Sequence, residues 1–185
     1  AAERVMPLYV ISSDTMVEAP PVAEYLHGVL TQMKKAAASE RLPIHVECVY
    51  PESDDTFWVN LLGRGYPAPR TKFRWCTDRL KIEPANNFIK NIVSKHGEAV
   101  MVLGARSAES SSRAQVLAKK QSQEYITAGA MLPSHSTLAN AYVYTPIKDW
   151  QTGDVWEYLL LNSTTPWGTS NRDLAQAVSD GEFRE

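Results

Sequence analysis

Two arginines, a glutamate and several hydroxyl groups lie together in a short segment that follows an apolar run. Side chains of these types could bind an anion. Segment 104–113 reads Gly-Ala-Arg-Ser-Ala-Glu-Ser-Ser-Ser-Arg and comes directly after apolar residues 99–103. A helix beginning there would offer unpaired backbone N–H groups, and Arg106 and Arg113 could add bidentate contacts to phosphate or sulfate. In the alternative interpretation the segment has only structural roles. A serine caps the helix, Glu109 interacts favourably with the helix dipole in the first turn, and the arginines are solvated. We expect an anion between the two guanidiniums. If they face apart, or if acidic neighbours hold them with no open hollow between them, an enzymatic function fails and only an α/β scaffold of unknown purpose is left.

A basic segment interleaved with aromatic side chains is the second chemical feature. Residues 64–81 contain six basic side chains and one acidic side chain, a net charge of +5, whereas the whole chain carries −2. Such a mixture suits phosphate backbones, with rings available for stacking on bases. Charge runs are more often solvated loops whose aromatic residues anchor them to the core, and the sequence leaves both interpretations open.

Cys76 lies within this basic segment, where positive neighbours favour the thiolate, the form that attacks sulfur or binds metal. Cys48 alternates with apolar residues in an expected strand, so we assign it to the core. The two cysteines complete neither a zinc set nor a Cys-x-x-Cys pair, and the four histidines show no metal-ligand spacing.

The elements that must position these residues alternate between two hydrophobic periods. Period-two or continuous apolar runs predict strands at residues 8–12, 44–50, 99–103 and 141–145. Helical spacing predicts helices that begin near residues 20, 84, 109 and 152. A long, irregular, basic loop is expected over residues 52–78. Buried strands alternating with helices predict an α/β fold, a parallel twisted sheet with helices on both faces and ligands at the carboxyl ends of the strands.

Composition narrows the class of protein further. A chain of 185 residues that is 44% hydrophobic and 22% charged is typical of one globular domain, here residues 1–185. The balance of 19 basic against 21 acidic residues argues against binding to nucleic acid by bulk charge alone. No apolar run approaches the roughly 20 residues of a membrane-spanning helix, and no signal-peptide pattern is present. We therefore expect a cytoplasmic protein with no membrane partner.

Three motifs in this order resemble the phosphoadenosine-phosphosulfate reductase branch of the adenine-nucleotide α-hydrolases. They are Val-Ile-Ser-Ser-Asp-Thr-Met-Val-Glu at residues 10–18, Arg-Trp-Cys-Thr at 74–77, and Gly-x-Arg-x-x-Glu-Ser-x-x-Arg at 104–113. Within that branch the chain is most similar to the DndC-like sulfurtransferases of DNA phosphorothioation. Thr77 stands where the sulfate-assimilation reductases tend to carry a second cysteine.

The resemblance implies an enzyme that uses ATP, releases pyrophosphate and replaces a non-bridging oxygen of the DNA backbone with sulfur. It implies as partners DNA, a cysteine desulfurase as sulfur donor and other phosphorothioation subunits. It assigns nucleotide binding to Asp14, Thr15 and Gly104, and catalysis to Arg106, Glu109, Ser110 and Arg113. It makes Cys76 a ligand of a 4Fe–4S cluster. It also gives the basic segment a DNA-binding role through Arg70, Lys72, Arg74, Arg79 and Lys81.

Two departures from the family qualify this function. The family's phosphate loop, Ser-Gly-Gly-x-Asp-Ser, does not occur in the sequence, and no cysteine follows Cys76. We therefore expect the first strand and the phosphate loop to be missing, with truncation at both ends relative to the family. Without its main-chain N–H cradle this segment alone is expected not to turn over ATP. The alternatives are a phosphoadenylyl-sulfate reductase-like thiol oxidoreductase and a non-catalytic nucleotide- or DNA-binding module.

Overall fold

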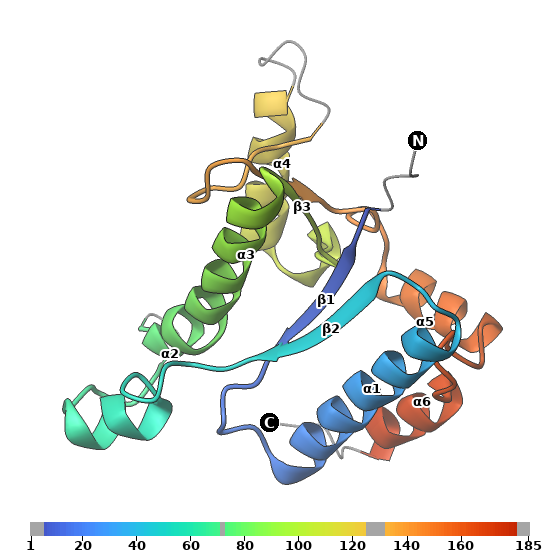
Figure 1. The fold of residues 1–185 in the computed structure, drawn as a ribbon, viewed down its shortest axis with the longest axis horizontal. Coiled ribbons are helices and arrows are strands. Elements are labelled where there is room, and N and C mark those ends of the chain that lie inside the picture. The colour runs from blue at the N-terminus through green and yellow to red at the C-terminus, as the bar shows by residue number, and fades with distance from the viewer. Residues whose placement is uncertain (1–5, 71–72, 125–131, 181–185) are drawn as a thin grey trace. The chain divides into compact units, whose positions relative to one another are not determined.

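The protein alternates strands and helices in the order expected of an α/β chain (Figure 1). A computed structural model describes residues 6–70, 73–124 and 132–180, so Lys72 lies outside the described residues. The elements are β1 (Leu8–Ser13), α1 (Pro20–Ser39), β2 (Ile44–Val49), η1 (Val59–Gly63), α2 (Trp75–Thr77), η2 (Asp78–Ile82), α3 (Glu83–His96), β3 (Ala99–Val102), η3 (Ser107–Glu109), α4 (Ser111–Glu124), β4 (Ala141–Tyr144), α5 (Thr152–Leu161) and α6 (Asn171–Asp180).

The strands form two parallel pairs. β1 pairs with β2 in a register that runs from Leu8 opposite Ile44 to Ser13 opposite Val49. β3 pairs with β4 in the same sense, and Ala99 lies opposite Ala141. Parallel neighbours need a crossover connection, which α1 supplies between β1 and β2. The predicted α/β class with parallel strands and helices is therefore confirmed.

The described residues group into two compact units, each with one strand pair. The first unit comprises the residues up to Asn87 together with those from Asn162 onward, and the second comprises Phe88–Leu161. Helix α3 (Glu83–His96) runs through the boundary between the two groups. The single domain over residues 1–185 stays a prediction, and we describe the two units one at a time.

In the first unit α1 packs against β2. Proline occupies the first turn of α1, where its missing N–H costs nothing. Leu30 and Ala37, seven residues apart and therefore on one helix face, are buried, as is Val46 on β2. His27 lies about one helical turn before Leu30, on a neighbouring part of the same helix face. The packing of α1 on β2 therefore brings His27 close to the β1–β2 pair.

Residues 52–78 contain helical turns that hydrophobic periodicity did not indicate. η1 lies within this range, and α2 and η2 follow at its end. Trp75 is 7% exposed, its Nε1 donates a hydrogen bond to the Pro67 carbonyl oxygen at 2.9 Å, and its ring stacks on Phe57. Tyr66 meets the Trp75 ring edge-on. These aromatic side chains therefore anchor the segment, as the alternative interpretation of the basic run proposed.

In the second unit the apolar core lies on one side of β3 and β4. Ile89, Leu138 and Ala141 are buried, and Ala99 and Met101 pack against them. The alternate residues Val100 and Val102 are 52% and 60% exposed. β3 was expected to be buried on both faces, but in the described structure its residues alternate between core and surface.

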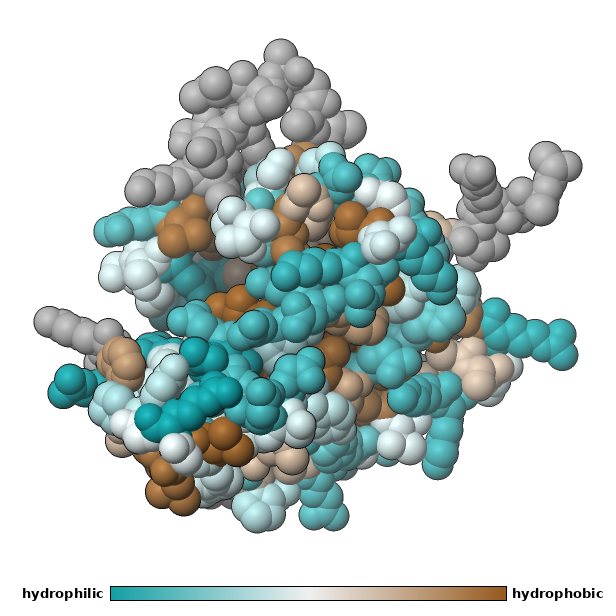
Figure 2. Space-filling model, turned by 60° about the vertical axis from the view of Figure 1, so that its left-hand side comes forward, coloured by the Kyte–Doolittle hydropathy of each residue, from teal (hydrophilic) through white to brown (hydrophobic). Residues whose placement is uncertain are grey.

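Apolar side chains also reach the surface elsewhere. Trp58 and Leu62, four residues apart at η1, are 57% and 75% exposed. Figure 2 shows separate apolar patches on a face that is otherwise largely hydrophilic. Among the described residues no helix combines the length and the apolar composition needed to cross a membrane.

Candidate functional site

The loop after β3 builds the first candidate site, within the second unit. The Ser107 N–H donates to the Lys148 carbonyl oxygen at 2.8 Å, which fixes the short helix η3 beside the segment after β4. α4 then begins at Ser111, and the Ser110 Oγ accepts a hydrogen bond from the Arg113 N–H at 3.2 Å. Ser110 therefore caps α4, as the serine-cap alternative proposed.

Arg106 and Arg113 converge on the carboxylate of Glu109. The Arg106 Nε lies 3.4 Å from Glu109 Oε1, and the Arg113 Nη1 contacts Glu109 Oε2. The Arg106 Nη1 also donates to Thr152 Oγ1 at 3.4 Å. The side chains of Arg106, Glu109 and Arg113 are 16%, 25% and 55% exposed, so the Arg113 guanidinium remains open to solvent. Glu109 thus occupies the point expected to receive an anion. An acidic neighbour therefore holds both guanidiniums, as the condition against an anion site specified, and an anion binds there only by displacing that carboxylate.

Gly104 follows β3 by two residues but has no local steric requirement for glycine. A Cβ added there would meet the Ile147 Cδ1 at 3.8 Å, an ordinary van der Waals contact. Its predicted contact with a nucleotide stays a prediction.

Asp14 and Thr15 follow β1 in the first unit and are 7% and 3% exposed. The Asp14 Oδ1 accepts the Met16 N–H at 2.8 Å, and its Oδ2 lies 2.9 Å from the His27 Nε2. The Thr15 Oγ1 donates to a Glu18 carboxylate oxygen at 2.9 Å. Both side chains are engaged within the protein, and their predicted contact with adenosine stays a prediction.

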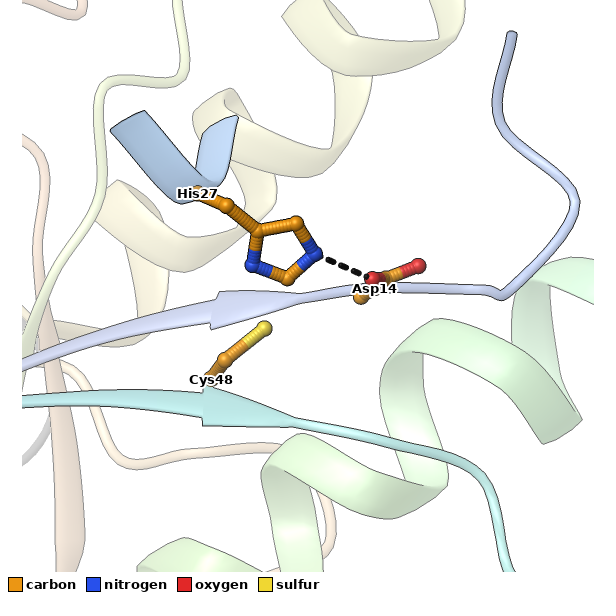
Figure 3. A group of neighbouring side chains, drawn as sticks. All are labelled: Asp14, His27 and Cys48. Carbon is orange, nitrogen blue, oxygen red and sulfur yellow. Dashed lines mark hydrogen bonds and ion pairs between the residues drawn. The ribbon is translucent and has the colours of Figure 1, made fainter. Parts of the chain in front are cut away.

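Cys48 completes a cluster that the sequence analysis missed (Figure 3). One ligand atom each from Asp14, His27 and Cys48 lies within 4.8 Å of the others. Successive members of the cluster are 13 and 21 positions apart in the sequence, too far for a spacing motif. The alternation of Cys48 with apolar neighbours indicates a core residue rather than a ligand. The available signal was that Cys48 stands at the carboxyl end of its strand, where ligands gather.

Tyr50 lies two residues beyond Cys48 at the exposed end of β2. A side-chain hydrogen bond with Cys48, followed by desolvation, raises the pKa of Tyr50 to about 12. The phenol therefore remains protonated at neutral pH and acts as the donor toward the sulfur.

Cys76 lies on α2 and is partly buried. Within the described ranges it joins no group of three His, Cys, Asp or Glu ligand atoms close enough to share a metal ion. A 4Fe–4S cluster takes four thiolates and this chain has two cysteines, so the residues present do not fit that cluster. We derive no chemistry through it.

Asp55 organises the basic segment. Its Oδ1 accepts hydrogen bonds from Arg79 at 2.8 Å, from Arg64 at 2.7 Å and from the Asn60 amide at 2.9 Å. Burial alone would raise the pKa of Asp55, but the hydrogen bonds from Asn60 and Arg79 and the two positive charges outweigh it and lower the pKa. Arg79 also donates to the Tyr66 hydroxyl at 3.0 Å.

The predicted DNA contacts therefore separate into two kinds. Arg79 lines a hollow of about 210 Å³ whose walls also carry Asp55 and Glu83, and Lys81 pairs with Glu18 at 3.4 Å. Arg70 and Arg74 are exposed and form no salt bridge with any described residue. Of the described members of the predicted set, these two are the cations most open to a phosphate backbone.

Comparisons with known proteins agree with the motifs. The family model "Phosphoadenosine phosphosulfate reductase domain" matches residues 6–167. The uncharacterized protein MJ0973 of Methanocaldococcus jannaschii is 27% identical over 106 residues, which cover 57% of this chain and 21% of that protein. The chain thus spans about a fifth of the curated relative that it matches.

The chain also matches one solved structure among those compared. The crystal structure of phosphoadenylyl-sulfate reductase from Candida auris in complex with phosphate has a TM-score of 0.49 and 16% sequence identity. That match covers 94% of this chain and 68% of the other. Because the family model spans most of the sequence, the chain belongs to the phosphoadenosine phosphosulfate reductase domain family.

Proposed function

We propose that this chain is a sulfurtransferase domain with ATP-pyrophosphatase chemistry that acts in DNA backbone phosphorothioation. Members of its family are enzymes that act on sulfur and nucleotide substrates. The proposal rests on the motif at residues 104–113, which places Arg106 and Arg113 beside the start of α4. Glu109 pairs with both guanidiniums there, so a phosphate group must displace that carboxylate to bind. Guanidiniums in that position suit the phosphate groups of a nucleotide.

Charge compensation is the role of the two arginines in this function. The Arg106 side chain is fixed by Thr152 and Glu109, whereas Arg113 is more exposed and can turn toward a ligand. Phosphate binding exchanges the Glu109 carboxylate for phosphoryl oxygens, and the guanidiniums then neutralise the charge that accumulates at phosphorus. ATP transfers its adenylyl group to an oxygen of the DNA phosphate and pyrophosphate leaves. AMP then departs with that oxygen when sulfur takes its place on phosphorus.

The first unit supplies the DNA and sulfur side of the proposal. Arg70 and Arg74 contact the phosphate backbone of DNA. Cys76 accepts sulfur from a cysteine desulfurase, and further phosphorothioation subunits complete the assembly. Thr77 beside Cys76 favours sulfur transfer over a reductase that relies on paired cysteines.

The test is the phosphorothioate content of DNA in cells whose own gene for this protein carries Arg106→Ala. We expect the modification to be lost while the protein accumulates normally. Lys95→Ala removes a positive charge from an exposed position on α3 and serves as the matched control, with content unchanged. Unaltered phosphorothioate content in the Arg106 variant would contradict the proposal.

A second candidate is a phosphoadenylyl-sulfate reductase-like thiol oxidoreductase, which the family match itself favours. Calorimetric titration with phosphoadenosine phosphosulfate and with duplex DNA, each at two salt concentrations, separates the two functions. Salt-sensitive DNA binding supports the sulfurtransferase, because phosphate contacts release counterions. Tight binding of the sulfonucleotide without DNA affinity selects the reductase.

A further inference from the structure

Asp14, His27 and Cys48 come from three different elements and point toward one another (Figure 3). Asp14 follows β1, His27 lies on α1, and Cys48 lies on β2. The three ligand atoms lie within 4.8 Å of one another, and the Asp14 Oδ2 is 2.9 Å from the His27 Nε2. All three residues belong to the first unit.

The strand register explains this convergence. Ser12 pairs with Cys48, and Asp14 and Val46 are each two residues from a member of that pair, so all four side chains share one face of the strands. Val46 is buried where α1 packs on β2. The same packing brings His27 onto the edge of that face, beyond the apolar contact.

We propose that Asp14, His27 and Cys48 bind a divalent cation of borderline softness, with Zn²⁺ as the preferred ion. One thiolate, one imidazole and one carboxylate are the three kinds of side chain that ligate zinc in proteins. The sulfur ligand disfavours Mg²⁺ and Ca²⁺, which prefer all-oxygen sites. Three protein ligands leave the fourth tetrahedral position open, as in catalytic zinc sites.

The three ligand atoms require only small shifts to accept the ion. Zinc–ligand bonds of about 2.0–2.3 Å place tetrahedral ligand atoms about 3.3–3.6 Å apart. The Asp14 and His27 atoms, now 2.9 Å apart, must separate slightly, and any pair near the 4.8 Å limit must approach by about 1.2–1.5 Å. Coordination replaces the direct contact of 2.9 Å between the Asp14 Oδ2 and the His27 Nε2. The Met16 N–H already donates to the other Asp14 oxygen and holds the carboxylate in place, as an outer-shell partner does.

Access and burial suit a bound ion. The Asp14 side chain is 10% exposed, which limits competition from water, whereas the His27 side chain is 47% exposed and leaves an approach from solvent. The competing interpretation is a plain Asp14–His27 hydrogen bond beside a Cys48 thiol that interacts with Tyr50, and it requires no metal. The proposal does not depend on the proposed function, because its measurements are of metal binding alone.

The experiment titrates the purified, chelator-treated full chain with Zn²⁺ by calorimetry and with Co²⁺ by absorption spectroscopy. We expect about one ion per chain and a thiolate-to-cobalt charge-transfer band in the near ultraviolet. Cys48→Ser should abolish that band and weaken Zn²⁺ binding by more than about tenfold. His27→Gln, at a half-exposed helical position that does not threaten folding, should weaken Zn²⁺ binding comparably while the band shifts with the altered ligand set.

Two matched variants exclude non-specific binding. Cys76→Ser removes the other thiol of the chain. His45→Gln removes a histidine whose ring centroid lies 4.9 Å from that of Tyr9. Neither residue belongs to the proposed ligand set, so both variants should bind zinc like the unaltered chain. Circular dichroism checks that each variant folds. The proposal is overturned if the unaltered chain binds no Zn²⁺, if Cys48→Ser keeps the cobalt band, or if His27→Gln binds zinc with unchanged affinity.

Discussion

Glu109 holds two guanidiniums at the place where an anion would bind, so its charge should weaken anion affinity. Glu109→Gln keeps the size of the side chain and removes that charge. Partly exposed ion pairs are worth about 0.2–1 kcal/mol each, so freeing both arginines should strengthen pyrophosphate binding by about two- to thirtyfold. Isothermal titration calorimetry measures the change.

Glu98→Gln provides the control for this prediction, because it removes an acidic charge from an exposed position in the same unit. We expect its pyrophosphate affinity to match that of the unaltered chain. Weaker binding by Glu109→Gln would mean that the carboxylate arranges the arginines for the anion rather than competing with it.

Asp55 should make the stability of the first unit sensitive to acid. Its pKa is lowered in the folded chain, so the stabilisation is complete above the ordinary carboxyl pKa of 3.8 and is lost as the pH falls below it. Asp55→Asn leaves Arg79 and Arg64 without their charged acceptor and should cost about 1–3 kcal/mol near neutral pH. The difference in the free energy of unfolding between this variant and the unaltered chain should shrink at about pH 3. Urea unfolding at neutral pH and at the acidic pH measures it.

Asp54 supplies the matched control for Asp55. Its side chain is 83% exposed and lies 3.8 Å from Arg64, so Asp54→Asn should change the free energy of unfolding by less than about 0.5 kcal/mol. Equal losses in both variants would show that net charge, rather than the specific contacts of Asp55, sets the acid sensitivity.

At the scale of elements, Trp75 joins α2 to the loop that precedes it. Trp75→Phe keeps an apolar ring but loses the hydrogen bond to Pro67, and should cost about 1 kcal/mol. Trp75→Ala also removes the packing on Phe57 and Tyr66, and should cost about 3–5 kcal/mol. Chemical denaturation followed by circular dichroism measures both; equal losses would place the stabilisation in the hydrogen bond alone.

Periodicity located most of the regular elements closely because each has an apolar face that repeats, but it did not indicate α6 (Asn171–Asp180). The strand expected at residues 8–12 is β1, and the helix expected from residue 20 begins at Pro20. The turns around η1 and α2 are too short to show a period, and side chains distant in the sequence hold them in place. Only three-dimensional packing could reveal them.

The candidate sites were predictable to different degrees for the same reason. Arg106, Glu109 and Arg113 are three and four residues apart at a helix start, so local spacing alone brings their charges together. His27 and Cys48 meet only through strand register and helix packing. A residue-by-residue scan of spacing has no access to such contacts.

At the scale of the whole molecule, the net charge of −2 hides a local basic surface. If Arg70 and Arg74 each neutralise one DNA phosphate, the double variant Arg70→Ala/Arg74→Ala should bind duplex DNA more weakly. It should also flatten the slope of log affinity against log salt concentration by about 1.8, since each contact contributes about 0.9. Fluorescence anisotropy across a salt series measures the slope.

The matched control for DNA binding is the double variant Lys34→Ala/Lys35→Ala, which removes two charges from exposed positions on α1. It changes the net charge by the same amount as the arginine variant, so it isolates the effect of position. We expect its slope to equal that of the unaltered chain, because only cations that touch phosphate release counterions. Equal slopes for the two double variants would instead place DNA recognition outside the basic segment and remove the DNA arm of the proposed function.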